Sequence, residues 1–188
     1  MAVLSLWQDY KLNINSINGS VTRELKQRYK QKVSAQVIWK GFAWSNHFSS
    51  RCWFRDVLLT TGHSIRAVAR VIVPAETLQE LHWIKRLGPQ PLGKHLYKHY
   101  KPERCLLMSN HLSFTQAIDY LPGIAQAKIK TLSHCAPQSL VQTTSLMRVQ
   151  AKATHATLDL LLIESFVDQN TPWLLSCAAK PSQLSEPY

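Results

Sequence analysis

The stretch Arg51-Cys-Trp-Phe-Arg-Asp-Val-Leu-Leu-Thr60, with Ser64-Ile-Arg-Ala-Val-Ala-Arg-Val-Ile-Val73 after it, decides the fold. Both runs are rich in β-branched, aromatic and other apolar residues, as β-strands are. Gly62 lies between them, where a tight connection needs a flexible backbone. Pro74 follows the second run and ends it, because proline has no N–H to donate to a neighbouring strand. The sequence therefore predicts an antiparallel hairpin.

Weaker patterns surround this hairpin on both sides. Val33, Ala35, Val37 and Trp39 alternate with polar residues, so we expect a half-buried strand with these four side chains on one face. Other expected elements are a helix over 20–31 capped by Ser20, a helix over 75–87 ended by Gly88, a short helix over 94–100, and strands over 105–108, 147–154 and 158–166. Residues 109–145 have no periodicity clear enough to assign. The sum is a single α+β domain over 1–188, an antiparallel sheet with flanking helices.

Bulk composition narrows the class of protein. The chain has 188 residues, of which 45% are hydrophobic, as in a soluble globular domain. No apolar run approaches the roughly 20 residues that a membrane helix needs, and the start has no basic segment typical of a secretion signal. We therefore expect a cytoplasmic protein. Its four cysteines form no C-x-x-C pair and are interpreted as reduced, structural thiols.

The net charge of +11 indicates an anionic partner. Nucleic acid, an anionic membrane surface and a small anionic substrate all satisfy this charge, and composition alone does not choose among them.

Two charged residues fall on apolar strand faces. Period two places Arg55 beside Trp53 and Val57, and it places Glu164 beside Leu160, Leu162 and Phe166. A buried charge needs a partner or a ligand, because burying it alone is costly. Spacing leaves two interpretations open: Arg55 and Glu164 form a salt bridge, or both line a pocket for a polar ligand.

The signals for a metal or cofactor are weak. His95 and His99 are four residues apart, which suits one helical face, but no third ligand has a helpful spacing. The chain has only six glycines and no phosphate-binding glycine loop. We expect neither metal nor cofactor.

Several motifs together resemble the chorismate lyase family over residues 17–97. They are Ser20-Val-Thr-Arg-Glu-Leu25, Gln36-Val-Ile-Trp-Lys-Gly-Phe42, Arg51-Cys-Trp-Phe-Arg-Asp-Val-Leu-Leu59, Ala69-Arg-Val-Ile-Val-Pro-Ala-Glu-Thr-Leu78 and Leu87-Gly-Pro-Gln-Pro-Leu-Gly93. Later, Leu160-Leu-Leu-Ile-Glu-Ser-Phe166 matches a family strand that carries an active-site glutamate. Residues 99–145 do not follow the family and are interpreted as an insertion or divergent segment.

The resemblance implies a six-stranded antiparallel sheet whose helices close over a buried ligand. It implies conversion of chorismate to 4-hydroxybenzoate and pyruvate, the first step of ubiquinone biosynthesis, without a cofactor. Arg55 and Glu164 take the catalytic roles, and Val21, Leu92, Arg55 and Glu164 contact the substrate. We add Arg70 as a second arginine for a substrate carboxylate, since the planar guanidinium fork suits carboxylates.

Two other functions compete with this one. The same fold could serve as a non-catalytic binding domain for an aromatic acid, as in effector-binding domains of bacterial regulators, although no helix-turn-helix is evident. A basic nucleic-acid-binding protein is the second competitor. The preferred hypothesis is a monomeric lyase that binds neither nucleic acid nor membrane.

Overall fold

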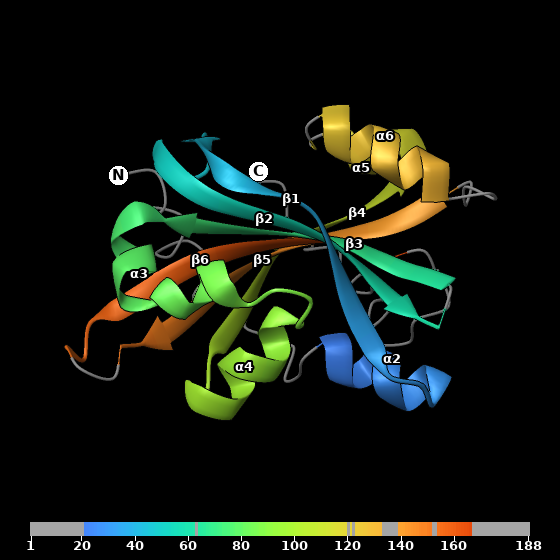
Figure 1. The fold of residues 1–188 in the computed structure, drawn as a ribbon. Helices are drawn as coiled ribbons and strands as arrows, with labels where there is room; N and C mark the ends of the chain where they lie inside the picture. The colour runs from blue at the N-terminus through green and yellow to red at the C-terminus, as the bar shows by residue number, and fades with distance from the viewer. Residues whose placement is uncertain are drawn as a thin grey trace, which may run out of the picture.

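The computed structural model describes residues 21–62, 64–119, 121, 123–132, 139–151 and 154–166. Its centre is one six-stranded sheet in the order β1-β2-β3-β6-β5-β4, with every neighbouring pair antiparallel (Figure 1). The strands are β1 (Val33–Ser45), β2 (Ser50–Thr61), β3 (Ser64–Pro74), β4 (Glu103–Ser113), β5 (Ser139–Gln150) and β6 (Thr157–Phe166). The predicted central hairpin is β2–β3, and the expected six-stranded antiparallel sheet is confirmed.

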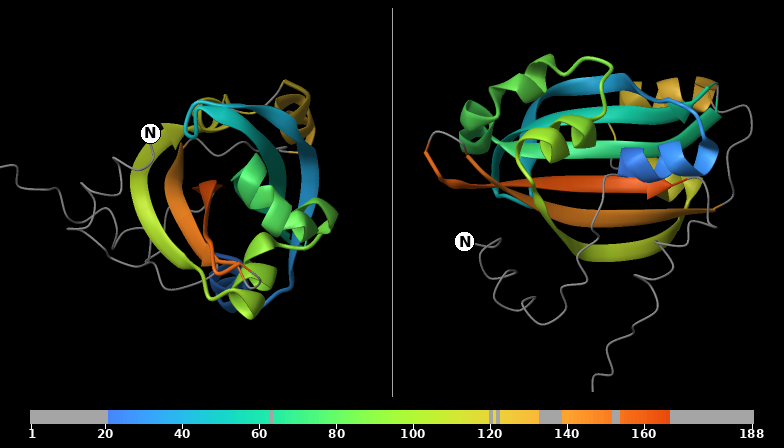
Figure 2. Two further views of the ribbon diagram at one scale, coloured as in Figure 1. Left: turned by 90° about the vertical axis from the view of Figure 1, so that its left-hand side faces the viewer. Right: turned by 90° about the horizontal axis from the view of Figure 1, so that it is seen from below.

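The sheet is strongly curved, and most helices lie inside the curve (Figure 2). These are α2 (Val21–Tyr29), α3 (Ala75–Glu80), the 3-10 helix η1 (His82–Arg86) and α4 (Leu92–His99). The outer, convex face is covered at one end by α5 (Phe114–Ile118) and α6 (Gly123–Leu132). None of the helices in the described ranges combines the length and the apolar character needed to cross a bilayer.

Strand pairing joins the two halves of the chain in the middle of the sheet. β3 pairs with β6, where Ala69 lies opposite Glu164 and Val71 opposite Leu162. On β2, Arg55 lies opposite Val71, so Arg55 and Glu164 share the concave face on either side of β3. More than half of the chain separates Arg55 from Glu164 in sequence, so strand pairing brings them together.

Both faces of the sheet are packed against other elements. On the concave side, apolar residues of the helices pack on Val71, Val73, Leu160 and Met147; they are Leu78 of α3, Ile84 of η1, and Leu92 and Leu96 of α4. Val21 and Leu25 of α2 pack nearby on β1, β2 and β3. Because β2, β3 and β6 are covered on both faces, their apolar runs are almost continuous rather than strictly alternating.

Two expectations need correction, and the segment 99–145, whose pattern assigned few elements, is now described. A register shift between Val37 and Trp39 moves Trp39 to the convex side, where it packs near Phe54, so it does not share a face with Val33 and Ala35. The expected helix over 75–87 is broken into α3 and η1, with Gly88 at φ +54° directly after it. Residues 99–145 supply β4, α5, α6 and part of β5, all of which belong to the sheet or cover it. The expected Ser20 cap lies outside the described residues.

Candidate ligand-binding site

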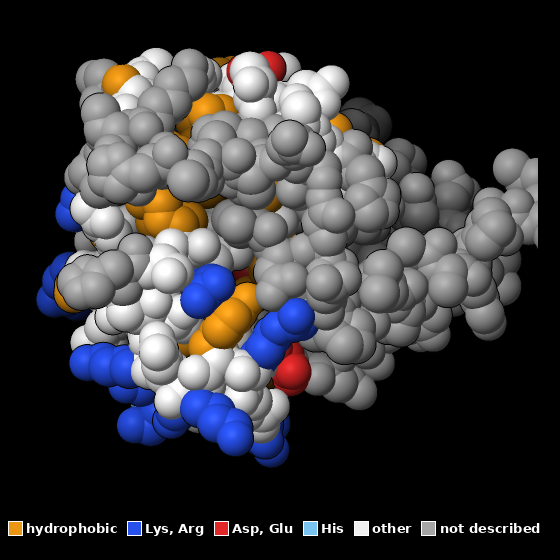
Figure 3. Space-filling view, turned by 90° about the vertical axis from the view of Figure 1, so that its right-hand side faces the viewer, with side chains coloured by type: hydrophobic (Ala, Val, Ile, Leu, Met, Phe, Trp, Pro, Cys, Tyr) orange, Lys and Arg blue, Asp and Glu red, His pale blue; other side chains and the backbone are white. Residues whose placement is uncertain are grey.

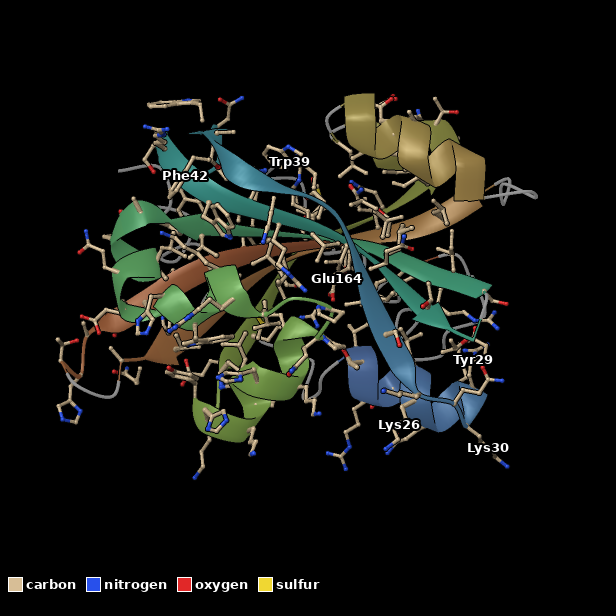
Figure 4. The ribbon with its side chains drawn as sticks, viewed as in Figure 1. Lys26, Tyr29, Lys30, Trp39, Phe42 and Glu164 are labelled. Atoms are coloured by element: carbon tan, nitrogen blue, oxygen red, sulfur yellow. The ribbon has the colours of Figure 1, made fainter. Side chains whose placement is uncertain are left out.

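An internal cavity of about 40 Å³ lies between the concave face and the helices α2 and α4. Its apolar wall includes Val21, Val57, Leu59, Ala69, Val71, Leu92, Met147 and Leu162. Its charged groups are Arg55, Arg104 and Glu164, each no more than 6% exposed. Figure 4 shows Glu164 near the middle of the sheet, away from its edges. The cavity is thus an apolar space with a few buried charges, the usual composition of a small-molecule site.

Arg55 bonds to the loop that leads into α4. Its Nη2 donates to the carbonyl oxygens of Gly88 at 2.8 Å and of Gln90 at 2.9 Å. Burial lowers the pKa of Arg55 to about 10, so the guanidinium remains cationic at neutral pH. Because both bonds use Nη2, Nε and Nη1 remain available to a ligand in the cavity.

Glu164 forms an ion pair with Arg104 of β4. Nη2 of Arg104 lies 2.5 Å from Oε2 of Glu164 and 3.0 Å from Oγ of Ser145. The plain salt bridge between Arg55 and Glu164, one of the two interpretations from spacing, is therefore not what the structure contains. Each of the two residues has its own partners, and both line the same cavity.

The cavity region also holds polar atoms that lack partners among the described residues. Nε of Arg104 and Oγ1 of Thr143 are both buried without a hydrogen bond. Thr143 lies opposite Glu164 in the β5–β6 pairing, so it belongs to the same part of the sheet. Buried polar atoms are almost always satisfied in folded proteins, so an unpaired guanidinium N–H beside a cavity indicates a place for a ligand or a water molecule.

Tyr97 adds a polar group from the helix side of the cavity. Burial raises the pKa of Tyr97, the nearby Arg104 lowers it, and Glu164 raises it. Its phenol therefore stays protonated at neutral pH and can donate a hydrogen bond.

Four of the residues singled out from the sequence line this cavity: Val21, Arg55, Leu92 and Glu164. Arg70 does not. It lies on the convex side and makes a two-point ion pair with Asp56, with Nε 2.7 Å from Oδ1 and Nη2 2.8 Å from Oδ2. Burial raises the pKa of Asp56, although the bonds and charge of Arg70 oppose that rise. Residues 55 and 70 lie on opposite faces because Arg70 is opposite Asp56, one position from Arg55.

Arg104 is the site residue that sequence reasoning missed. It lies in β4, whose pattern was readable only over 105–108, so its position next to a strand gave no indication of which way it faced. Arg104 is two residues before Leu106, the spacing of residues on one strand face. This is a weak signal that Arg104 faces inward, because a lone charge at the start of a strand is usually exposed.

The two histidines of α4 lie together but not as a metal site. The ring centroids of His95 and His99 are 4.4 Å apart, and His95 stacks on Trp83 at 4.0 Å. Within the described ranges, no three His, Cys, Asp or Glu side chains are grouped so that they could hold a metal ion.

The fold and this site define a class: a curved antiparallel sheet whose helices enclose a small charged cavity. Among solved structures, the chain is similar to the effector domain of PhnF from Mycobacterium smegmatis, with a TM-score of 0.52 and 10% identity over 79% of this chain and 88% of that one. A structure of PhnF from the same organism gives the same TM-score and identity over 64% of its chain. No protein-family model matches the sequence, and no curated protein matches it significantly.

At 10% identity the likeness shows the fold alone. The expected α+β fold, an antiparallel sheet with flanking helices, is thereby confirmed. Catalytic activity is not addressed by these neighbours.

Proposed function

We propose that this chain is a small-molecule-binding domain whose internal cavity takes an aromatic carboxylic acid. The observation that carries the proposal is the pair of buried arginines, Arg55 and Arg104, on an otherwise apolar wall. With Glu164 ionised, the three charges sum to one positive charge, which suits a monoanion. Arginine forks bind carboxylates at two points, and the apolar residues around them suit a ring. The structural neighbour is named an effector domain, which supports binding rather than turnover.

The cavity must open to admit such a ligand. Its 40 Å³ has room for about three water molecules, which is less than an aromatic acid needs. Helix α2 packs on β1, β2 and β3 through two buried side chains, Val21 and Leu25, so the area that its outward movement exposes lies around these two contacts. We infer that α2 and the start of α4 act as a cover that separates when ligand enters and closes again over it.

Calorimetry with 4-hydroxybenzoate tests this proposal. We expect binding by the unaltered protein and at least tenfold weaker binding by Arg55→Met, because the ligand carboxylate loses a charged partner. Ala69→Leu fills the floor of the cavity and should also abolish binding. Arg148→Met is the matched control, because Arg148 is partly exposed and pairs with Asp159.

The proposal fails if 4-hydroxybenzoate and benzoate do not bind at all. It also fails if Arg148→Met weakens binding as much as Arg55→Met does, since the effect would then be one of net charge.

A second candidate, chorismate lyase activity, is favoured by one specific observation. The two residues to which the resemblance assigns catalytic roles, Arg55 and Glu164, line one cavity despite being far apart in sequence. In this reaction the C–O bond between the ring carbon and the enolpyruvyl oxygen breaks, the ring carbon that carries the hydroxyl loses its hydrogen as a proton so that the ring becomes aromatic, and the released enolpyruvate takes up a proton to become pyruvate.

The roles of the residues follow from their positions. Arg55 holds a carboxylate of the dianion, and the closed cover excludes water. Glu164 and Arg104 lie together in the cavity wall. In this proposal the carboxylate accepts a hydrogen bond or a proton from the ring, and the guanidinium stabilises negative charge on the departing enolpyruvyl oxygen.

Incubation with chorismate separates the two candidates. Release of 4-hydroxybenzoate and pyruvate in equal amounts, with and without a chelator, would support the lyase, and Glu164→Ala should then cut the rate by at least a hundredfold. Asp159→Ala is the control carboxylate outside the cavity. Binding of 4-hydroxybenzoate without any turnover of chorismate would exclude the lyase and would be consistent with a small-molecule-binding domain.

A further inference from the structure

A second, larger cleft lies outside the internal cavity. Its volume is about 610 Å³, and its walls are the first half of α2, the start of β1, and residues 89–94 with Tyr97. It shares Thr22, Pro91, Gly93 and Tyr97 with the internal cavity, so the two spaces are neighbours. The outer cleft is large enough for a metabolite-sized ligand without any movement of the chain.

The charge of this cleft has one sign. Four cations line it, namely Arg23, Lys26, Lys32 and Lys94, and its lining contains no Asp or Glu. All four side chains are exposed, and none has an acidic partner within the part of the chain that the structure describes. Figure 3 shows Lys and Arg side chains gathered at the end of the molecule where α2 lies, and Figure 4 shows Lys26 projecting from α2. Unpaired like charges held around one concave space repel each other unless an anion is present.

Backbone groups add to the same field. Thr22 and Arg23 belong to the first turn of the nine-residue helix α2, and Gly93 and Lys94 to the first turn of the eight-residue helix α4. At α4 the N-cap residue is Pro91, which makes no side-chain hydrogen bond to the first turn. The positive end of a helix dipole favours an anion at such a position.

We propose that the outer cleft is a binding site for a small molecule that carries phosphate groups. Three of its four cations are lysines, whose compact charges suit phosphate oxygens. The internal cavity instead has two buried arginines, whose planar forks suit a carboxylate. Four cations call for an anion of several charges, and a phosphate carries close to two at neutral pH together with three acceptor oxygens. A ligand there contacts α2 and α4 at once.

Calorimetry of the full chain with inorganic pyrophosphate tests the site. We expect one equivalent to bind at low salt, and we expect the double variant K26Q/K94Q, which removes one cation from each wall, to bind at least tenfold more weakly. The matched control K40Q/K98Q removes two exposed lysines that do not line the cleft, and it should stay within about twofold of the unaltered protein. Both variants should retain their circular dichroism spectra and their binding of 4-hydroxybenzoate.

Three results would overturn the proposal. They are no binding of pyrophosphate, equal weakening in the two double variants, and citrate binding as tightly as pyrophosphate, which would show that any polyanion suffices. Both double variants could lose affinity for a single-stranded oligonucleotide equally, while only K26Q/K94Q loses affinity for pyrophosphate. That result would support a small-molecule site in the cleft, beside a diffuse attraction of nucleic acid to the basic surface. The phosphate site and the internal carboxylate site are tested with different ligands and different residues, so either can fail alone.

Discussion

The ion pair between Glu164 and Arg104 makes a sharp prediction about stability. Both residues are 6% exposed, so replacing Glu164 by leucine leaves a buried guanidinium without a counter-charge. Breaking such a pair costs about 3–5 kcal/mol. For a domain of this size, 1 kcal/mol corresponds to about 2–4 °C in Tm. Glu164→Leu should therefore lower Tm by roughly 6–20 °C, measured by circular dichroism on heating.

Two further variants decide whether the reasoning is right. Removing both charges with Arg104→Met and Glu164→Leu together should recover most of the loss, because the uncompensated charge is gone. Asp159→Leu breaks the pair with Arg148, whose side chains are 26% and 24% exposed, and it should cost at most about 1 kcal/mol. The reasoning is refuted if Glu164→Leu is no worse than Asp159→Leu, or if the double variant is as unstable as the single one.

Three more outcomes follow from the described contacts. Gly88→Ala should lower the free energy of unfolding in urea by about 1–2 kcal/mol, because φ is +54° at Gly88. It should also weaken 4-hydroxybenzoate binding, because the Gly88 carbonyl accepts a hydrogen bond from Arg55. Unchanged stability would contradict this backbone conformation. Asp56→Asn removes the counter-charge of the buried Arg70 and should cost about 3–5 kcal/mol in the same assay, yet it should leave ligand affinity unchanged, since this pair lies on the other face. Burial raises the pKa of the Cys52 thiol, so Cys52 should be alkylated far more slowly at pH 8.5 in the folded protein than in the protein unfolded in urea. Mass spectrometry measures the labelling. Fast labelling of the folded protein would mean that this strand is exposed.

Local sequence pattern was sufficient for the strands that are covered on both faces. The 51–60 and 64–73 runs, with Gly62 between them, specify the β2–β3 hairpin because turn chemistry and strand propensity agree there. The side of the sheet that Arg55 and Glu164 occupy was also readable, since period two follows directly from strand geometry. The resemblance to chorismate lyase added the expectation that both residues serve one site.

Pattern was insufficient where an element depends on a distant partner. The bulge at Val37–Trp39 interrupts the period of β1, so Trp39 moves to the other face without any change in local composition. The 99–145 segment contains an edge strand and short helices, whose apolar positions make sense only against the sheet that they cover.

The sequence by itself determined the fold class, the central hairpin and a net charge of +11. The pairing of β3 with β6 decided that Arg55 and Glu164 face one cavity, and the pairing of β4 with β5 decided that Arg104, not Arg55, neutralises Glu164. The pairing of β2 with β3 placed Arg70 with Asp56, outside the site. The physical reason is that side-chain direction is a local property of a strand, whereas the identity of an ionic partner depends on which strands lie next to each other, and that is a property of the whole chain.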